Sequence, residues 1–355
     1  MVITNVIIKD FLVFNGIFTA TFCNGVNVFI GANGTGKTTL LKCLYAATDT
    51  NGYDASHYFN SPEINKNRDR ISRIINRPDE RQVELDSLPA VAVFMSSSDD
   101  WDKTDNKIYS KINIISSHSE DGKKFNDEYT ANPLVYNINK NSVYIPEKDM
   151  LSNSKGLPES VIYGKAQFTI FDIDIVMKAR VLAYTPEQPL YRKLCDIIGG
   201  EPQNDGQSFY MKRPNINTLI PFPLEASGYR KLGLLATLIR NEQIKDDTVL
   251  LWDEPENSLN PELIPALVNI LLELAQTGVQ IFIATHDYNL ARHFDVRKNK
   301  DISVLYHNLS KTNNGQIVCH SSSEYTKLPD NSFERANVNL FEAVVTNAMR
   351  AEDDE

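Results

Sequence analysis

The sequence predicts an α/β protein whose parallel β-sheet is covered by helices on both faces. Buried apolar strands alternate with helical segments between residues 228 and 285, which is typical of such a sheet. Another apolar strand, a glycine-rich loop and a helical segment follow one another between residues 26 and 47. Residues 1 to 30 show the alternating apolar pattern of further strands.

The composition is that of a globular protein, with 42% hydrophobic and 23% charged residues in a chain of 355. The formal net charge of -10 argues against a protein that coats nucleic acid through bulk charge, although it leaves room for a local basic patch. The four cysteines lie far apart in the sequence and predict neither a zinc knuckle nor a disulfide framework, which fits a reducing cytoplasm.

No segment predicts a signal peptide or a membrane span. The charged Asp10 comes too early for a signal peptide, and no long apolar region follows it. The most apolar later stretch, Leu263 to Ala284, is interrupted by four polar side chains and predicts a buried helix and strand. We therefore expect a cytoplasmic protein that does not enter the membrane.

The middle and the end of the chain predict additional elements around this core. Residues 50 to 90 are polar and predict loops and short helices, whereas three strand-like pieces (AVAVFM, KINIIS and SVYIP) follow before residue 150. Residues 165 to 198 predict helix, and residues 199 to 224 a hairpin. The roughly 70 residues after His286 predict a strand, a hairpin and a final helix.

The stretch GANGTGKT fits the phosphate-loop pattern G-x-x-x-x-G-K-[ST] at every fixed position. Its glycines allow backbone N–H groups to surround phosphate oxygens, and the following helix directs its positive end at them. Lys37 is predicted to bridge the β- and γ-phosphates, and the Thr38 hydroxyl to bind Mg²⁺. The alternative is a glycine-rich turn that binds nothing. The predicted nucleotide-binding residues are Gly31, Ala32, Asn33, Gly34, Thr35, Gly36, Lys37, Thr38 and Thr39.

The apolar strand TVLLWDE ends in two acids. A nucleotide hydrolase needs such a pair of carboxylates opposite its phosphate loop. Asp253 is predicted to hold Mg²⁺, and Glu254 to accept a proton from the attacking water. His286 ends the next buried strand and is predicted to bond the γ-phosphate or to orient the water. Alone, each would be an ordinary polar residue at a strand end; together with the phosphate loop, they predict a catalytic site.

These motifs resemble those of the ABC-type ATPase heads of the SMC, RecF and OLD families. The resemblance rests on GANGTGKTTL, EASGYRKLGLL, LLWDEPENSLNP and ATHD. With YIPEKDMLS added, the chain is similar to compact bacterial AAA-type proteins associated with phage-defence or abortive-infection loci. The resemblance implies a P-loop NTPase fold, with a mixed β-sheet lobe and a helical lobe. It covers about residues 1 to 50 and 143 to 310.

The resemblance implies a single ATPase head over the whole chain. Its nucleotide-binding core is expected in residues 1–50 and 225–310, with residues 51–224 forming an inserted β/helical lobe and residues 311–355 a C-terminal hairpin, helix and acidic tail. In such families two heads close around two ATP molecules, and each contributes a signature loop to the other's γ-phosphate.

In this chain the signature loop corresponds to residues 226–230, with Ser227 and Gly228 as the expected phosphate contacts. A shift of one residue would place Ala226 on the family's usual serine. The family's glutamine loop is expected after SVYIP, where this chain has Glu147 and Lys148.

The motifs favour an ATP-driven switch over three related classes. The chain lacks the heptads of full SMC proteins, the metal-binding nuclease segment of OLD proteins and the DEPT sequence of transporter ATPases. We expect ATP and Mg²⁺ to bind, a homodimer or higher oligomer to form, and a separate effector to be controlled in antiviral defence. Two alternatives remain open: a RecF-like ATPase that handles DNA, and a nucleotide-gated scaffold with little turnover.

Overall fold

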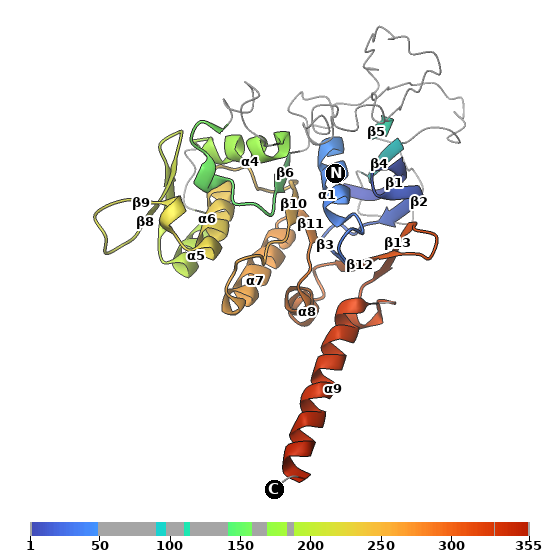
Figure 1. The fold of residues 1–355 in the computed structure, drawn as a ribbon. Coiled ribbons are helices and arrows are strands. Elements are labelled where there is room, and N and C mark those ends of the chain that lie inside the picture. The colour runs from blue at the N-terminus through green and yellow to red at the C-terminus, as the bar shows by residue number, and fades with distance from the viewer. Residues whose placement is uncertain are drawn as a thin grey trace.

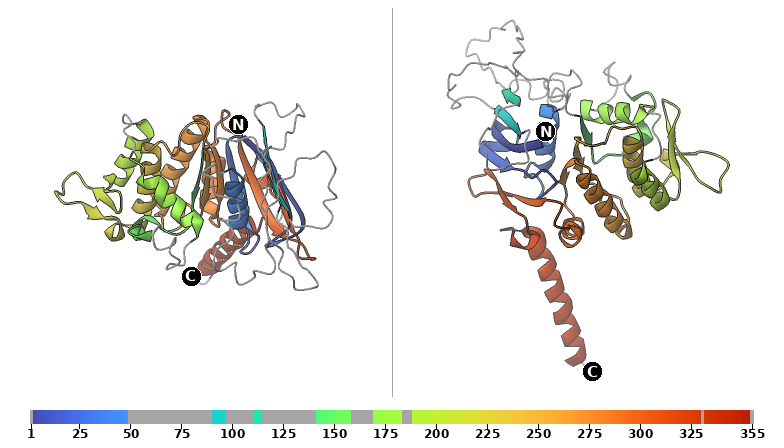
Figure 2. Two further views of the ribbon diagram at one scale, coloured as in Figure 1. Left: turned by 90° about the horizontal axis from the view of Figure 1, so that it is seen from above. Right: turned by 180° about the vertical axis from the view of Figure 1, so that it is seen from behind.

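The computed structural model describes residues 2–48, 90–96, 110–113, 141–157, 169–182, 188–329 and 331–353. In this part of the chain, one helix lies between two β-sheets, further helices cover the outer face of the larger sheet, and a last helix projects from the body (Figures 1 and 2). The polar stretch 50–90 lies outside the described residues except for Ala90.

The larger sheet has six strands in the order β13-β12-β3-β11-β10-β6. Neighbouring strands are parallel throughout except for the antiparallel pair β12–β13. The parallel sheet expected from the sequence is therefore confirmed. The strands are β3 (Val26–Gly31), β6 (Ser142–Ile145), β10 (Val249–Asp253), β11 (Gln280–Ala284), β12 (Val304–Lys311) and β13 (Ile317–Ser322).

Successive residues of the central strands pack into opposite cores, which explains why these strands are apolar throughout. In β10, Leu250 and Trp252 belong to one hydrophobic core, whereas Val249 and Leu251 belong to the other. All four side chains are fully buried. Alternating side chains point to opposite faces of a strand, so a sheet covered on both faces requires apolar residues at every position.

The second sheet is antiparallel and has the order β2-β1-β4-β5. Its strands are β1 (Val2–Phe11), β2 (Phe14–Thr21), β4 (Ala90–Ser96) and β5 (Ser110–Asn113). Helix α1 (Lys37–Thr48) lies between this sheet and the parallel sheet (Figure 2). Leu40, Leu41 and Leu44 of α1 are fully buried there. Of the strand pieces expected between residues 91 and 150, two extend this sheet and the third, β6, joins the parallel sheet.

Five helices cover the other face of the parallel sheet (Figure 1). They are α4 (Ile170–Arg180), α5 (Pro189–Ile198), α6 (Ser227–Arg240), α7 (Ile264–Gln276) and α8 (Tyr288–Arg297). The helical segment expected at 165–198 forms α4 and α5. Helix α8 was not expected; it begins where the Asp287 side chain accepts a hydrogen bond from the N–H of Leu290.

Beside α5 and α6 lies a small antiparallel sheet in the order β7-β8-β9, formed by Glu201–Asn204, Phe209–Lys212 and Ile220–Pro221. Strands β7 and β8 are the expected hairpin. Short 3-10 turns occur at Leu151–Asn153, Phe222–Leu224, Pro261–Leu263 and Tyr325–Lys327.

The last helix, α9 (Ser332–Asp353), projects away from the rest of the molecule (Figures 1 and 2). Its first turn is attached to the body, where Phe333 packs against the larger hydrophobic core. Among the described residues, no helix is long and apolar enough to cross a membrane.

Candidate nucleotide site

The phosphate loop connects β3, which ends at Gly31, to α1, which begins at Lys37. Gly31, Gly34 and Gly36 all have positive φ, the region that favours glycine. Space also requires glycine here, because a Cβ on Gly31 would lie 2.2 Å from the Leu309 carbonyl oxygen. The glycines therefore allow the loop to turn sharply and to pack closely against β12, while Ala32, Asn33 and Gly34 stay exposed.

Lys37 is buried within the loop that it follows. Its Nζ donates hydrogen bonds to the carbonyl oxygens of Gly31 at 2.7 Å and Ala32 at 3.1 Å. Burial lowers the pKa of Lys37 to about 8, and nearby acids, Glu254 foremost, offset part of this shift. The loop is closed on its other side by the Thr35 hydroxyl, which donates to the Ala32 carbonyl at 2.9 Å. Thr39 follows in the first turn of α1.

Asp253, at the end of β10, meets the start of α1 across the sheet edge. Burial raises the pKa of Asp253, while a hydrogen bond with Thr38 opposes that shift. The Tyr144 hydroxyl lies 3.4 Å from the same carboxylate. A hydroxyl and a carboxylate are hard oxygen donors of the kind that Mg²⁺ prefers, and both sit beside the phosphate loop. Among the described residues, no group of three or more His, Cys, Asp or Glu side chains could hold a metal ion.

Glu254 has an unusual backbone conformation, and hydrogen bonds fix both its N–H and its carbonyl. Its φ is 46°, in the left-handed region that residues other than glycine rarely adopt. Its N–H donates to the Ala284 carbonyl at 2.8 Å, and its own carbonyl accepts from Lys231 Nζ at 2.7 Å. Such strain persists where the surroundings fix it, and it is concentrated at functional sites.

His286 faces the Glu254 side chain, with Nε2 lying 3.3 Å from Oε1. Burial, and then the negative charges of Glu147 and Asp253, raise the pKa of Glu254. Burial, and then the positive charge of Lys37, lower the pKa of His286. A carboxylate with raised pKa beside a neutral imidazole is suited to accepting a proton near neutral pH.

The loop after Glu254 is fixed by a second acid, Glu256. Its Oε1 accepts hydrogen bonds from the Thr285 hydroxyl at 2.5 Å and from the His286 N–H at 3.2 Å. Burial raises the pKa of Glu256 to about 7. Glu256 therefore connects the segment after β10 to the segment after β11, and so sets the spacing of Glu254 and His286.

Ser227 and Gly228 begin α6 and lie against the loop at 258–259, not against the phosphate loop of the same chain. The Ser227 hydroxyl donates to the Ser258 carbonyl at 3.3 Å, and a Cβ on Gly228 would lie 3.1 Å from Leu259 Cδ1. Beside this contact is a hollow of about 300 Å³, lined by residues of both segments. The free N–H groups at the start of α6 are a favourable place for phosphate.

The loop after β6 contacts both the segment that follows Glu254 and the start of α6. Glu147 Oε1 accepts a hydrogen bond from the Asn257 amide at 2.8 Å. Asp149 forms an ion pair with Arg230 of α6, with an N–O distance of 2.7 Å. The place where a glutamine loop was expected thus carries an acid that contacts the loop after Glu254.

The structure brings together Lys37, Thr38, Asp253, Glu254 and His286, as their positions at the carboxyl ends of neighbouring parallel strands require. Lys231 and Glu256 also belong to this site, and neither was predicted from the sequence. Glu256 lies in PENSLNP, which was noted only as a whole, and Lys231 follows Arg230 in the signature segment without a distinguishing pattern.

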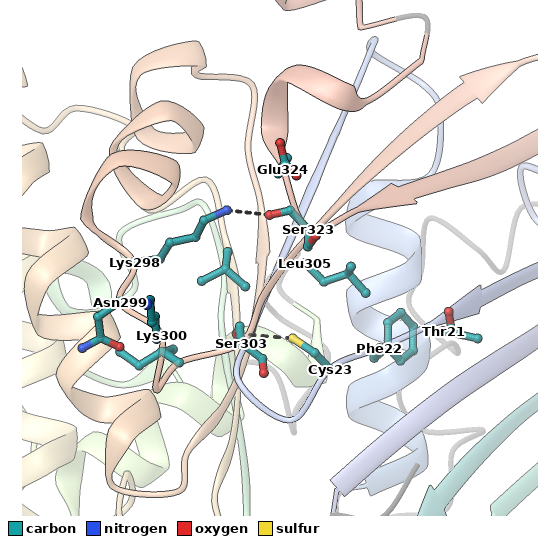
Figure 3. A pocket seen from close by; sticks show the side chains of 12 residues that line it. Thr21, Phe22, Cys23, Lys298, Asn299, Lys300, Ser303, Leu305, Ser323 and Glu324 are labelled. Atoms are coloured by element: carbon teal, nitrogen blue, oxygen red, sulfur yellow. Dashed lines mark hydrogen bonds between the residues drawn. The ribbon is translucent and has the colours of Figure 1, made fainter. Parts of the chain in front are cut away.

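A second hollow, of about 730 Å³, lies at the opposite edge of the parallel sheet (Figure 3). Lys298 and Cys23 line it, but both are already engaged. The Lys298 amine donates to the Ser323 carbonyl, and the Cys23 thiol to the Ser303 carbonyl (Figure 3). Its lining does not include the phosphate loop, Glu254 or His286, so we place the candidate site at the carboxyl edge.

Comparison with known families agrees with this geometry. A family model described as "AAA domain, putative AbiEii toxin, Type IV TA system" matches residues 26–292. The match spans the phosphate loop, the start of α6, both strand-end acids and His286.

Individual relatives match over shorter stretches. The arginine transport ATP-binding protein ArtP of Haemophilus influenzae is 37% identical over 103 residues, covering 28% of this chain and 40% of that protein. ArtP of Escherichia coli K12 is 31% identical over 117 residues, covering 32% and 40% respectively. The chain therefore spans well under half the length of these curated relatives.

Solved structures share the fold at low sequence identity. An SMC head bound to the C-terminal winged-helix domain of ScpA has a TM-score of 0.50 and 15% identity, over 92% of this chain and 99% of that one. An SMC head with an extended coiled coil, bound to the C-terminal domain of ScpA and derived from Pyrococcus furiosus, has a TM-score of 0.50 and 14% identity, over 96% and 99%. The α/β P-loop head expected from the sequence is confirmed.

Proposed function

The chain belongs to the AAA-domain family that its residues 26–292 match, and from this we propose that it is an ATP-hydrolysing switch. Two copies close head-to-tail around ATP, hydrolysis separates them, and the change of shape controls a separate effector. The observation that carries the proposal is Glu254, fixed in a strained backbone with its carboxylate 3.3 Å from His286 and beside the phosphate loop.

The roles of the individual residues follow from their positions. The backbone N–H groups of the phosphate loop and the Lys37 amine bind the phosphates. Thr38 and Asp253 are the residues that would hold Mg²⁺, which neutralises charge on the β- and γ-phosphate oxygens when bound. Glu254 accepts the proton of the attacking water, and His286 orients that water or bonds the γ-phosphate.

The start of α6 supports a two-copy mechanism. Ser227 and Gly228 pack beside the chain's own segment 258–259, and their N-terminal helix position suits a phosphate. In a head-to-tail pair this surface meets the phosphate loop of the second copy. Each nucleotide is then enclosed by Lys37 of one copy and Ser227 of the other.

Control of a separate effector rests on the family description, which names a toxin–antitoxin system. An ATP-driven change of shape is a suitable signal to such an effector, and a role in bacterial defence against phage fits this setting. We propose the cytoplasm as its location.

The proposal is tested by ATP turnover of the purified protein beside Glu254→Gln, with Mg-ATP. The amide keeps the size of the side chain but cannot accept the proton, so turnover should fall by about a hundredfold or more while ATP still binds. Glu324→Gln, an exposed acid beside the hollow at the opposite edge of the parallel sheet, is the matched control and should retain full turnover. Equal turnover in Glu254→Gln and wild type would contradict the assigned role.

A further inference from the structure

Helix α9 carries an apolar face that no described residue of the same chain covers. Its large apolar side chains are strongly exposed, with 64% of Leu340, 69% of Phe341 and 59% of Val344 accessible to solvent. These residues lie on one side of the helix, while Arg335, Asn339, Glu342 and Thr346 lie on the other. An exposed apolar stripe on a projecting helix is a mark of an interaction surface.

The helix begins beside the candidate catalytic site. The ring of Phe333, in its first turn, makes an edge-to-face contact with the His286 ring, with centroids 6.3 Å apart. Asn331 fixes the start of the helix through hydrogen bonds from the N–H groups of Phe333 and Glu334. The base of α9 therefore contacts His286, which faces Glu254, and the helix projects from the body (Figure 1).

From the contact with His286 we propose that the apolar face of α9 docks on a second copy of this chain. This inference rests on the proposed head-to-tail pair, in which a second copy lies against the surface that holds Lys37, Glu254 and His286. A helix of 22 residues spans about 33 Å, so α9 extends far along whatever lies against that surface.

The half of the molecule that contains α6 offers a matching surface. Just before α6, Leu224 is 77% exposed, and Ile216 and Leu219 are 45% and 44% exposed. A head-to-tail pair places this half of one copy opposite the phosphate loop and the base of α9 of the other. Docking there buries apolar surface on both sides, and most of the stability of a helix in a protein comes from packing of its apolar face.

The contact between Phe333 and His286 also couples ATP binding to docking of α9. A ligand can shift an equilibrium only through interactions that differ between the two states. His286 contacts both Glu254 and the base of α9, so closure around the γ-phosphate sets the direction of the helix that grips the second copy.

The test is the dissociation constant of the ATP-bound dimer, measured by sedimentation equilibrium on full-length protein with Mg-ATP. All variants carry Glu254→Gln, so that ATP is retained. We expect the added pair Leu340→Gln and Phe341→Gln to weaken the dimer by about tenfold or more. Glutamine favours helix, so α9 itself is preserved.

The control pair, Asn339→Gln and Thr346→Gln, changes the opposite face of α9 and should leave the dissociation constant unchanged. Leu224→Gln tests the receiving surface without altering α9, and it should also weaken the dimer. An unchanged dissociation constant in the Leu340 and Phe341 variant, or equal weakening in the control pair, overturns the proposal. If Glu254→Gln alone remains monomeric with ATP, the proposed ATP dimer fails first and the docking fails with it.

Discussion

At the scale of single residues, three neighbours determine the properties of Glu254. Its carboxylate faces His286, its carbonyl is held by Lys231, and its charge is influenced by Glu147. Each neighbour affects a different property of Glu254: its partner, its backbone geometry or its pKa. Substitutions should therefore separate these properties.

Replacing Glu147 by Gln should move the acid limb of the pH–rate profile. Glu147 is negative and raises the pKa of Glu254, so removing its charge lowers that pKa and keeps Glu254 ionised to lower pH. The acid limb of kcat/KM, which reports the free enzyme, should shift to lower pH. Glu147→Asp, which keeps the charge, is the control; an unshifted limb in Glu147→Gln would show that Glu147 does not act on Glu254.

Replacing Lys231 by Met should lower kcat by about tenfold or more with little change in KM, because the backbone of Glu254 loses its support. Steady-state kinetics would measure the two constants separately. Lys231→Arg retains a donor and should recover part of kcat. If KM rises and kcat stays constant, Lys231 contributes to binding and not to positioning.

At the scale of elements, a buried side-chain amide links the two sheets by hydrogen bonds. Gln280 of β11 accepts a hydrogen bond from the Ile3 N–H and donates to the carbonyls of Ile3 and Cys23, at 2.8 to 2.9 Å. The pairing of β1 with β4 is irregular between Ile3 and Asn5, so the Gln280 side chain satisfies the backbone where the strand pairing shifts.

Gln280→Leu should therefore destabilise the fold by about 2–4 kcal/mol, since it leaves buried backbone groups unpaired. Urea unfolding monitored by circular dichroism measures this loss. Gln276→Leu, on the exposed end of α7, should change stability by less than about 0.5 kcal/mol. Equal effects of the two substitutions would show that Gln280 has no special role.

The sequence was sufficient for the parallel sheet and the phosphate loop because both depend on local signals. Apolar residues at every position of β10 and β11 predict burial on both faces, and the glycine spacing predicts the loop. Gln280 and Lys231 were not predictable, because their partners lie 277 and 23 residues away and a polar residue in a strand or helix has no periodic mark. Helix α8 was missed because its polar side chains weaken the helical pattern.

At the scale of the whole molecule, each copy carries two separate parts of the proposed ATP site. Lys37, Asp253, Glu254 and His286 lie together, whereas Ser227 and Gly228 lie beside residues 258–259. In the head-to-tail pair that we propose, both sites are completed at once and α9 provides an additional contact between the copies. We propose that each ATP is hydrolysed by residues of two copies.

The most direct measurement is ATP turnover after mixing two inactive variants, Lys37→Met and Ser227→Glu. Lys37→Met removes the amine that is expected to bind the phosphates. Ser227→Glu places a negative charge where the second copy's γ-phosphate lies in the proposed pair, while glutamate at a helix start keeps α6 stable. Mixed pairs contain one intact site, so random exchange should restore about a quarter of wild-type turnover. If the mixture stays as inactive as each variant while exchange of copies is demonstrated, the shared site is contradicted.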